Sequence, residues 1–474
     1  MSGGQCRPAP RFGTDGVRGV ANLDLTPEWA VALGRVAARV LCTASPSPGG
    51  FVVGRDTRAS GAMLSAALAA GIASEGVDVI DLGVITTPGV AWVAAQRGVP
   101  GAVISASHNP YTDNGVKFFA AGGTKLSDRE EGSIQAGLDA GEVGGEGPTP
   151  SGRLQPGEGP PPGSDGPAPV GSVTFAPELC HGYSEHLVAS LEGRRLDGLS
   201  VVVDCANGAA THIAPEVIRA LGAEVVATGD RPDGHNINEK CGSTHLDHLR
   251  ELVATHSCDV GLAFDGDADR CLAVDHRGGE VDGDRMIALF ALDLNDRGLL
   301  GSSAVVVTHM TNLGFRLAMA GHGITTIDTD VGDRNVLVAM EREGAVLGGE
   351  QSGHVIFRSC ATTGDGILTG LALLDLVARR GKPLSDLAAA VMTRLPQKLV
   401  SVQVADPGAL NGAADVWAEV DRANTELGRS GRVLVRPSGT EPKVRVMVEA
   451  ESEQVAEQVA ERLANAVSAS LGAG

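Results

Sequence analysis

The chain has 474 residues, which is too long for one hydrophobic core and predicts three or four domains. Apolar residues make up 43% of the sequence and aromatic residues 3%, so Val, Leu, Ala and Ile must build the cores. The formal charge of −20 argues against nucleic acids and membranes as partners, and it leaves any phosphorylated substrate to be captured by local basic loops.

Apolar strands alternate with alanine-rich helices along most of the chain. The first such unit is expected to have strands at 51–53, 77–80 and 101–104, with helices at 61–75 and 89–97. Similar units begin at 199–204, followed by a helix at 212–221 and a strand at 223–226, and at 304–307, followed by a helix at 312–321. This repetition predicts an α/β protein with three related α/β domains, each with a parallel or mixed sheet covered by helices.

The carboxyl-terminal part follows a different pattern. A strand at 399–404, a helix at 413–427, two strands around Arg436 and a helix at 454–471 predict a smaller α+β domain. We place the four domains at residues 1–172, 173–275, 276–386 and 387–474.

Residues 141–172 are rich in Gly and Pro and contain few apolar side chains. Such a segment cannot bury enough surface to offset the entropy of ordering it, so we expect a flexible surface linker. A binding segment of unknown purpose is the less favoured alternative. The eight cysteines form no C-x-x-C pair, and neither a signal sequence nor a membrane-spanning run is evident, which predicts a cytoplasmic protein.

Ser107 follows a buried strand at 101–104 and precedes Asn109-Pro110, which prevents a helix from starting there. We therefore expect Ser107 to be exposed at the carboxyl end of that strand. It has three interpretations: a turn-capping hydroxyl, a hydrolase nucleophile with His108 as base, or a serine that carries a phosphoryl group. The hydrolase is disfavoured, because adjacent side chains on an extended segment point apart and no Gly-x-Ser-x-Gly elbow is present.

Three carboxylates, Asp265, Asp267 and Asp269, alternate in a glycine-containing loop between two apolar strands. Like charges converge in this way only if a cation or several donors hold them. Oxygen ligands favour Mg²⁺, whose site leaves room for a phosphate oxygen, whereas an EF-hand lacks its distal Glu and flanking helices here. A solvated acidic turn is the alternative, and the Ser107 segment argues against it.

Two further loops add binding groups. Residues 348–354 place small, hydrogen-bonding side chains between apolar stretches, which suits sugar hydroxyls but is a weak signal alone. Residues 436–445 offer two guanidinium groups, two hydroxyls and backbone amides, the groups that bind a phosphate dianion. Taken alone, that second loop is equally compatible with a surface loop of fortuitous charge.

These four segments, in this order and at this spacing, resemble the phosphohexomutase family of phosphoserine enzymes. The resemblance starts at residues 11–19 and covers nearly the whole chain. Within the family, residues 236–238 and 241–245, Gln351 and residues 362–366 resemble the phosphoglucosamine mutase branch. At 332–335 the sequence departs from that branch, which more often has an aromatic residue after the arginine. The family's four domains surround a central cleft, and the fourth closes over it.

The resemblance implies conversion of glucosamine 6-phosphate to glucosamine 1-phosphate for cell-envelope synthesis, through a bisphosphate intermediate. A sugar 1,6-bisphosphate would act as primer. A mutase for mannose or glucose phosphates, a phosphatase and a non-catalytic sugar-phosphate-binding protein are the alternatives. The amide of Gln351 can donate and accept hydrogen bonds, so it permits a 2-amino group nearby without requiring one. The oligomeric state stays open.

The resemblance also implies roles for individual residues. Phosphorylated Ser107 would donate its phosphoryl group, with Mg²⁺ held by the serine phosphate, Asp265, Asp267 and Asp269. Lys117 matches the family's candidate general base, with a pKa lowered by Arg18 and Arg270, although Lys117 and Arg18 could instead be phosphate clamps. The remaining site residues are His108 in the catalytic group; Arg270, Glu350, Ser352 and His354 at the sugar; and Arg436, Ser438, Gly439, Thr440 and Arg445 at the phosphate not being transferred. His354 is either a ligand contact or a group that orients its loop, and the second is slightly favoured.

Overall fold

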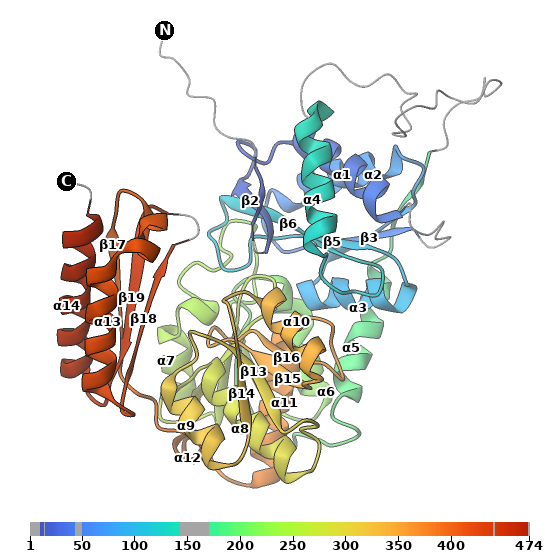
Figure 1. Ribbon diagram of the computed structural model, residues 1–474. Coiled ribbons are helices and arrows are strands. Elements are labelled where there is room, and N and C mark those ends of the chain that lie inside the picture. Colours follow the sequence, from blue (N-terminus) through green and yellow to red (C-terminus); the bar gives the residue numbers. More distant parts are fainter. Residues whose placement is uncertain (1–9, 14, 43–49, 143–169, 439–440, 473–474) are drawn as a thin grey trace. The chain divides into compact units, whose positions relative to one another are not determined.

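The computed structural model describes residues 10–13, 15–42, 50–142, 170–438 and 441–472. These residues pack into two compact units. One unit lies within residues 1–309 and 327–387, and the other within residues 310–326 and 388–474 (Figure 1).

A mixed seven-stranded sheet begins the first unit. Its spatial order is β1 (Phe12–Gly13), β2 (Gly16–Val20), β6 (Asp113–Phe119), β5 (Gly101–Ile104), β3 (Phe51–Arg55), β4 (Val79–Val84) and β7 (Val173–Phe175). Its helices are α1 (Pro27–Cys42), α2 (Gly61–Ala73), α3 (Thr87–Arg97) and α4 (Asp128–Gly137), followed by a π-helical turn at Leu138–Glu142. Helices α1 and α2 lie side by side (Figure 1), and a Cβ at Gly34 would lie only 2.3 Å from the carbonyl oxygen of Leu68. Glycine therefore allows these two helices to pack closely.

The second sheet has the order β12 (Glu280–Val281), β11 (Cys271–Asp275), β10 (Val260–Phe264), β8 (Ser200–Asp204) and β9 (Glu224–Thr228). The α-helices of this region are α5 (Cys180–Ala189), α6 (Ala214–Ala220) and α7 (Asp247–His256), with short 3₁₀ helices at Pro177–Leu179, Ala209–His212 and Gly242–Thr244. Strands β10 and β11 are antiparallel neighbours, and all ten of their residues are buried. The loop that joins them, residues 265–270, therefore lies at one edge of this sheet.

The third sheet has the order β14 (Thr325–Thr329), β13 (Ala304–Thr308), β15 (Leu347–Gly349) and β16 (Val355–Phe357), and it belongs to the first unit except for the start of β14. Its α-helices are α8 (Gly283–Asp296), α10 (Asp333–Glu343) and α11 (Gly366–Arg380), and α12 (Leu384–Val391) follows. Val306, Val336, Met340 and Ile356 form part of its buried core.

The second unit contains an antiparallel sheet in the order β17 (Gln397–Gln403), β19 (Lys443–Glu449) and β18 (Arg432–Pro437). Helices α13 (Ala414–Leu427) and α14 (Glu453–Leu471) lie together on this sheet (Figure 1), and α9 (Leu313–Gly321) and a 3₁₀ helix (Pro407–Gly412) complete the unit. The fully buried carboxylate of Glu449 accepts hydrogen bonds from the Leu313 amide at 2.9 Å and from Arg432 Nε at 2.6 Å. This carboxylate ties α9 to the carboxyl-terminal sheet.

Three α/β regions with mixed sheets and a small carboxyl-terminal α+β region confirm the predicted fold class. The strand expected at 77–80 begins two residues later, after a turn at Gly76, whose φ is 81°. The domain boundaries at residues 172, 275 and 386 stay predictions. Most of the predicted linker, residues 143–169, lies outside the described residues. Among the described helices, none has both the length and the apolar character needed to cross a membrane.

Candidate active site

Ser107 lies on the loop after β5 with a φ of 53°, a left-handed conformation that residues other than glycine rarely adopt. Its exposed fraction is 0%, so the prediction that Ser107 is exposed is wrong. The loop after β10 covers it, and a Cβ at Gly266 would lie 2.6 Å from the Ser107 carbonyl oxygen. Asn238 covers it from another side and donates to the carbonyl oxygens of Ser107 at 2.9 Å and Asn109 at 3.0 Å.

The buried guanidinium group of Arg58 forms hydrogen bonds with the same loop. It donates to the carbonyl oxygens of Ser107 at 2.8 Å and Asn109 at 2.9 Å, and it also contacts the carbonyl oxygens of Pro110 and Asp113. These charge-assisted hydrogen bonds stabilise several loop carbonyl groups at once.

The guanidinium is in turn held by Asp56, whose Oδ2 lies 2.9 Å from Arg58 Nε; both side chains are fully buried. Asp56 also accepts a 2.6 Å hydrogen bond from Ser105 Oγ, which accepts one from the Ser107 amide at 2.9 Å. Asp56, Arg58 and Asn238 were not predicted as site residues, although Asn238 belongs to the segment 236–238 that resembles the phosphoglucosamine mutase branch. For the first two a signal exists, because they directly follow β3, which is parallel to β5 and therefore ends at the same edge of the sheet.

The hydroxyl of Ser107 has two polar neighbours. It donates to Asp265 Oδ2 at 2.5 Å, and its Oγ lies 3.2 Å from His108 Nδ1. The expectation that the Ser107 and His108 side chains point apart is therefore wrong, because the left-handed backbone at Ser107 is not extended. Burial, together with the positive charges of Arg270 and Arg18, lowers the pKa of His108 to about 4, so this imidazole is neutral at pH 7.

Asp265, Asp267 and Asp269 converge as the sequence predicts, with one oxygen atom from each lying within 4.8 Å of the others. All three are buried, and burial together with the charges of Asp269 and Asp267 raises the pKa of Asp265. Asp267 Oδ1 and Asp269 Oδ1 are buried and have no hydrogen-bond partner. Unpaired, buried carboxylate oxygens are costly unless a cation binds them. The three residues thus fit a hard divalent cation such as Mg²⁺.

Lys117 on β6 faces the same carboxylates. Its Nζ lies 3.0 Å from Asp267 Oδ2, 3.1 Å from Asp269 Oδ2 and 2.9 Å from Asp15 Oδ2. Burial alone would lower the pKa of Lys117, but these three carboxylates outweigh it and hold that pKa well above its ordinary value. Arg18 does lower the pKa of Lys117, as expected, but the carboxylates outweigh it, so the predicted net lowering of this pKa is wrong. Arg18 also pairs with Asp15 at 2.6 Å.

The sugar-loop candidates lie between β15 and β16. Glu350 Oε1 accepts a hydrogen bond from the Gly332 amide at 3.1 Å, whereas Ser352 Oγ is buried without a hydrogen-bond partner. His354 is 2% exposed, and its Nε2 accepts a hydrogen bond from the Gly364 amide at 3.2 Å. This geometry favours loop orientation over ligand contact for His354.

Residues 362–366 connect the sugar loop with the carboxylate loop. The Gly364 amide donates a hydrogen bond to His354 Nε2, and the Gly366 amide donates one to the Ala268 carbonyl oxygen at 3.0 Å. Asp365, 2% exposed, accepts a 2.8 Å hydrogen bond from the hydroxyl group of Tyr183 on α5. Burial raises the pKa of Asp365 to about 6.

Arg436 and Arg445, the predicted phosphate ligands, lie directly opposite each other on β18 and β19 of the second unit. Arg445 also forms an ion pair with Glu441 at 3.5 Å. Arg445 Nε is buried without a hydrogen-bond partner, and the Ser438 amide donates to the Lys443 carbonyl oxygen at 2.8 Å. Gly439 and Thr440 lie outside the described residues.

In the first unit, contacts within hydrogen-bond or ion-pair distance thus bring together residues from three sheets. They connect Ser107, His108, Lys117, Asp265, Asp267, Asp269, Arg270 and His354, and the link between Arg270 and Asp269 is an ion pair at 3.9 Å. Arg270 Nη1 donates to His108 Nδ1 at 3.1 Å.

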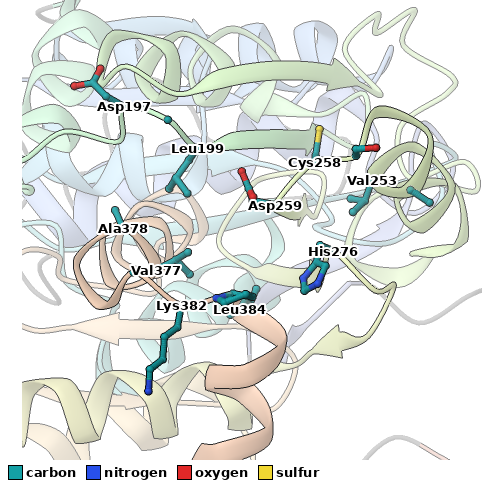
Figure 2. A pocket seen from close by; sticks show the side chains of 15 residues that line it. Asp197, Leu199, Val253, Cys258, Asp259, His276, Val377, Ala378, Lys382 and Leu384 are labelled. Atoms are coloured by element: carbon teal, nitrogen blue, oxygen red, sulfur yellow. The ribbon is translucent and has the colours of Figure 1, made fainter.

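A pocket of about 730 Å³ lies elsewhere, at the opposite ends of β8 and β10 (Figure 2). Asp197, Leu199 and Asp259 precede these strands, His276 follows β11, and Lys382 lies between α11 and α12. None of the predicted site residues lines this pocket.

Sequence models of the phosphoglucomutase/phosphomannomutase family match most of the chain. The α/β/α domains I, II and III match residues 9–143, 181–279 and 282–395, and the C-terminal domain matches residues 399–466. Together with the serine and carboxylate loops, these matches show that the chain belongs to the phosphoglucomutase/phosphomannomutase family.

Individual relatives show which members of that family the chain resembles. The phosphoglucosamine mutases of Rhodococcus jostii and Streptomyces avermitilis are each 51% identical to this chain. The alignment with the Rhodococcus jostii enzyme covers 94% of this chain and 96% of that enzyme. The alignment with the Streptomyces avermitilis enzyme covers 97% and 99%. The resemblance to bacterial phosphoglucosamine mutases thus extends over nearly the full length.

Solved structures agree with the fold. A phosphoglucomutase/phosphomannomutase family protein from Burkholderia thailandensis has a TM-score of 0.77 at 25% identity, covering 96% of this chain and 97% of that one. N-acetylphosphoglucosamine mutase from Aspergillus fumigatus, in complex with GlcNAc-6P and magnesium, has a TM-score of 0.68 at 20% identity, covering 97% and 96%. At 20% identity, the similarity to the Aspergillus fumigatus enzyme shows a common fold.

Proposed function

We propose that the protein is a phosphoglucosamine mutase, an isomerase that interconverts glucosamine 6-phosphate and glucosamine 1-phosphate. One observation carries the chemistry: Ser107 Oγ, on a left-handed backbone, lies 2.5 Å from a buried carboxylate cluster with unpaired oxygens. The substrate assignment is supported by the full-length similarity to bacterial phosphoglucosamine mutases. The product would supply amino-sugar precursors for the cell envelope, in the cytoplasm.

Asp265, Asp267 and Asp269, with a phosphoryl oxygen on Ser107, would hold Mg²⁺, which would offset the negative charge of the transferring phosphoryl group. Arg58, Asn238 and Asp56 keep the Ser107 loop in place through buried hydrogen bonds. This fixed geometry would keep the serine oxygen aligned for transfer in both directions.

Transfer starts from phosphorylated Ser107. The bond between phosphorus and Ser107 Oγ breaks as a bond between phosphorus and a sugar oxygen forms, and the proton of the sugar hydroxyl ends on Ser107 Oγ. The bisphosphate then reverses its orientation, and Ser107 recovers the other phosphoryl group. A sugar 1,6-bisphosphate would phosphorylate the serine of idle enzyme and so act as primer.

Lys117 has two candidate roles in this scheme. As the ammonium that its three carboxylate neighbours favour, it would stabilise the transferring phosphoryl group, with Arg18 and Arg270 contributing further positive charge. As a neutral amine it would accept the hydroxyl proton. Replacing Lys117 with Arg keeps the charge and removes the base, so retained activity would support the first role.

Recognition of the sugar would use Glu350 and Ser352, with His354 orienting their loop. Gln351 has an amide that would tolerate the 2-amino group, although its Nε2 lies 3.5 Å from Asp282 Oδ2. The phosphate that is not transferred would bind Arg436, Ser438, Gly439, Thr440 and Arg445. A mutase for mannose or glucose phosphates remains the second candidate, because an amine and a hydroxyl are weakly discriminated in one pocket.

A substrate panel tests the proposal. Purified protein with Mg²⁺ and a sugar 1,6-bisphosphate is expected to give the highest kcat/KM with glucosamine 6-phosphate, and Ser107→Ala is the inactive control. An equal or higher kcat/KM with mannose 6-phosphate or glucose 6-phosphate would assign the protein to the second candidate. Release of inorganic phosphate without monoester product would identify a phosphatase.

A further inference from the structure

Six ionisable groups form a closed ring beside the carboxylate cluster: three carboxylates, two lysines and one histidine, whose Nε2 accepts a hydrogen bond from the Gly364 amide. They come from the regions of all three sheets in the first unit. In order, they are Asp269, Lys117, Asp15, Lys125, Asp333 and His354.

The first half of the ring links the carboxylate loop to the first sheet. Asp269 Oδ2 lies 3.1 Å from Lys117 Nζ, which lies 2.9 Å from Asp15 Oδ2. The second oxygen of Asp15 lies 2.8 Å from Lys125 Nζ. Asp15 is therefore shared between two ammonium groups and the Arg18 guanidinium, which lies 2.6 Å from Oδ2, whereas Lys125 is the ion-pair partner of Oδ1.

The second half closes the ring through helix α10. Lys125 Nζ forms an ion pair with Asp333, the first residue of α10. Asp333 Oδ2 lies 3.6 Å from His354 Nε2, and His354 Nδ1 lies 3.9 Å from Asp269 Oδ2. These last two contacts are longer than hydrogen bonds, so the ion pairs on the lysine side are the stronger connection.

The start of α10 also contacts the sugar loop. Gly332, which precedes the helix with a φ of 126°, donates its amide to Glu350 Oε1 at 3.1 Å. One short segment, residues 332–333, thus touches both a sugar-loop carboxylate and the lysine that holds Asp15. A shift of α10 would move these two contacts together.

Burial makes the ion pairs sensitive to substitution. The Lys117 side chain is 4% exposed, that of Lys125 is 13% exposed and that of Asp333 is 9% exposed. Removing one member of a buried pair leaves an uncompensated charge, and its neighbours must rearrange. Loss of Lys125 would leave Asp15 Oδ1 without its ammonium partner, so Asp15 would be held only through Oδ2, by Lys117 and Arg18.

We propose that Lys125 and Asp333 are positioning residues for phosphoryl transfer. Acting through Asp15, they hold Lys117 against Asp267 and Asp269, and they make that placement depend on the start of α10. The catalytic part rests on the proposed function, because it assigns Lys117 a role at the transferring phosphoryl group. The placement of Lys117 is a separate claim and has its own measurement.

The test compares Lys125→Met, Asp333→Asn and the double variant with a matched control. Glu131→Gln is that control, because Glu131 pairs with Arg334 of α10 at 3.0 Å, whereas its interaction with the ring is a weaker charge interaction with Lys125. Each ring variant is expected to lower kcat by about tenfold or more while KM changes by less than about threefold. The control is expected to stay within about twofold of the wild type.

Two further comparisons distinguish positioning from general damage. Lys125→Arg keeps the charge and is expected to recover part of the kcat lost in Lys125→Met. The double variant is expected to lose no more activity than the less active of the two single variants, because both substitutions break the same ring. Losses that multiply, or ring variants that match Glu131→Gln, would overturn the proposal.

Acetylation of Lys117 by acetic anhydride, followed by peptide mass spectrometry, provides a readout that needs no activity. The labelling rate of Lys117 is expected to rise several-fold in both ring variants and to stay unchanged in Glu131→Gln. An unchanged rate in the ring variants would refute the placement claim. Wild-type protein inactive on every sugar phosphate would instead refute the proposed function, while the labelling result would still decide the placement.

Discussion

Gly266→Ala is the substitution for which the structure predicts the clearest effect at the active site. A Cβ at position 266 would lie 2.6 Å from the Ser107 carbonyl oxygen, 2.8 Å from Ile237 Cδ1 and 3.0 Å from Asn238 Nδ2. The backbone carbonyl cannot move away easily, because it accepts hydrogen bonds from both Arg58 and Asn238. The carboxylate loop and the serine loop must therefore separate.

The size of the effect follows from these distances. Ordinary van der Waals contact would require the Cβ and the carbonyl oxygen to be about 0.8 Å farther apart. Such a displacement changes the distance between Ser107 Oγ and Asp265, which is 2.5 Å in the native structure. Misplacement on the order of 1 Å costs about 100-fold in rate. Overpacking of this kind also destabilises a protein by about 1–3 kcal/mol.

The assay is kcat/KM with glucosamine 6-phosphate, together with the Mg²⁺ concentration at half-maximal activity and the Tm. Gly132→Ala is the matched control, since Gly132 lies within α4 and a Cβ there would have nothing within 4 Å. The control is expected to keep full activity and gain up to about 1 kcal/mol of stability. If Gly266→Ala kept activity within about threefold of the wild type, close contact between these loops would not be needed for catalysis.

Four further predictions test the site and the linker. Ser107→Ala should abolish turnover and remove phosphate from the peptide that contains residue 107. Loss of the hydroxyl that donates to Asp265 should also lower the free energy of unfolding by about 1 kcal/mol. Phosphate found only on another residue of the wild-type protein would contradict the assignment of Ser107. Asp267→Asn should lower Mg²⁺ affinity and activity together, whereas undiminished wild-type activity in a chelator would make the carboxylate loop structural. The pKa of Asp365 is about 6 in the folded state, so the folded state binds this proton more tightly than the unfolded chain does, and the free energy of unfolding should fall as the pH rises from about 4 to about 6. Asp365→Asn should remove up to about 3 kcal/mol of this pH dependence. An unchanged curve of Tm against pH in Asp365→Asn would refute the prediction. Deleting residues 145–168 should leave Tm and turnover nearly unchanged, and a large fall in Tm would show that the segment packs.

Local pattern alone predicted most elements of this fold. The strand at 101–104 has the expected bounds, and the carboxyl-terminal helices begin within one residue of the expected positions. The carboxylate loop between two buried strands was also predictable, because buried strands are continuous apolar runs and the polar residues between them must lie at a sheet edge. These properties depend on neighbours in the sequence, so the sequence by itself determined them.

The environment of the reactive groups depended on tertiary structure. Ser107 is buried because Asn238 and Gly266, more than a hundred residues away in the chain, cover its loop. The pKa of Lys117 is raised because the charges of Asp15, Asp267 and Asp269 outweigh both burial and the opposing charge of Arg18. Which groups meet at a sheet edge is set by strand order and register, and electrostatic energy varies inversely with distance. Spacing along the chain encodes neither quantity, so only the folded structure decided the conformation of the serine and the charge on the lysine.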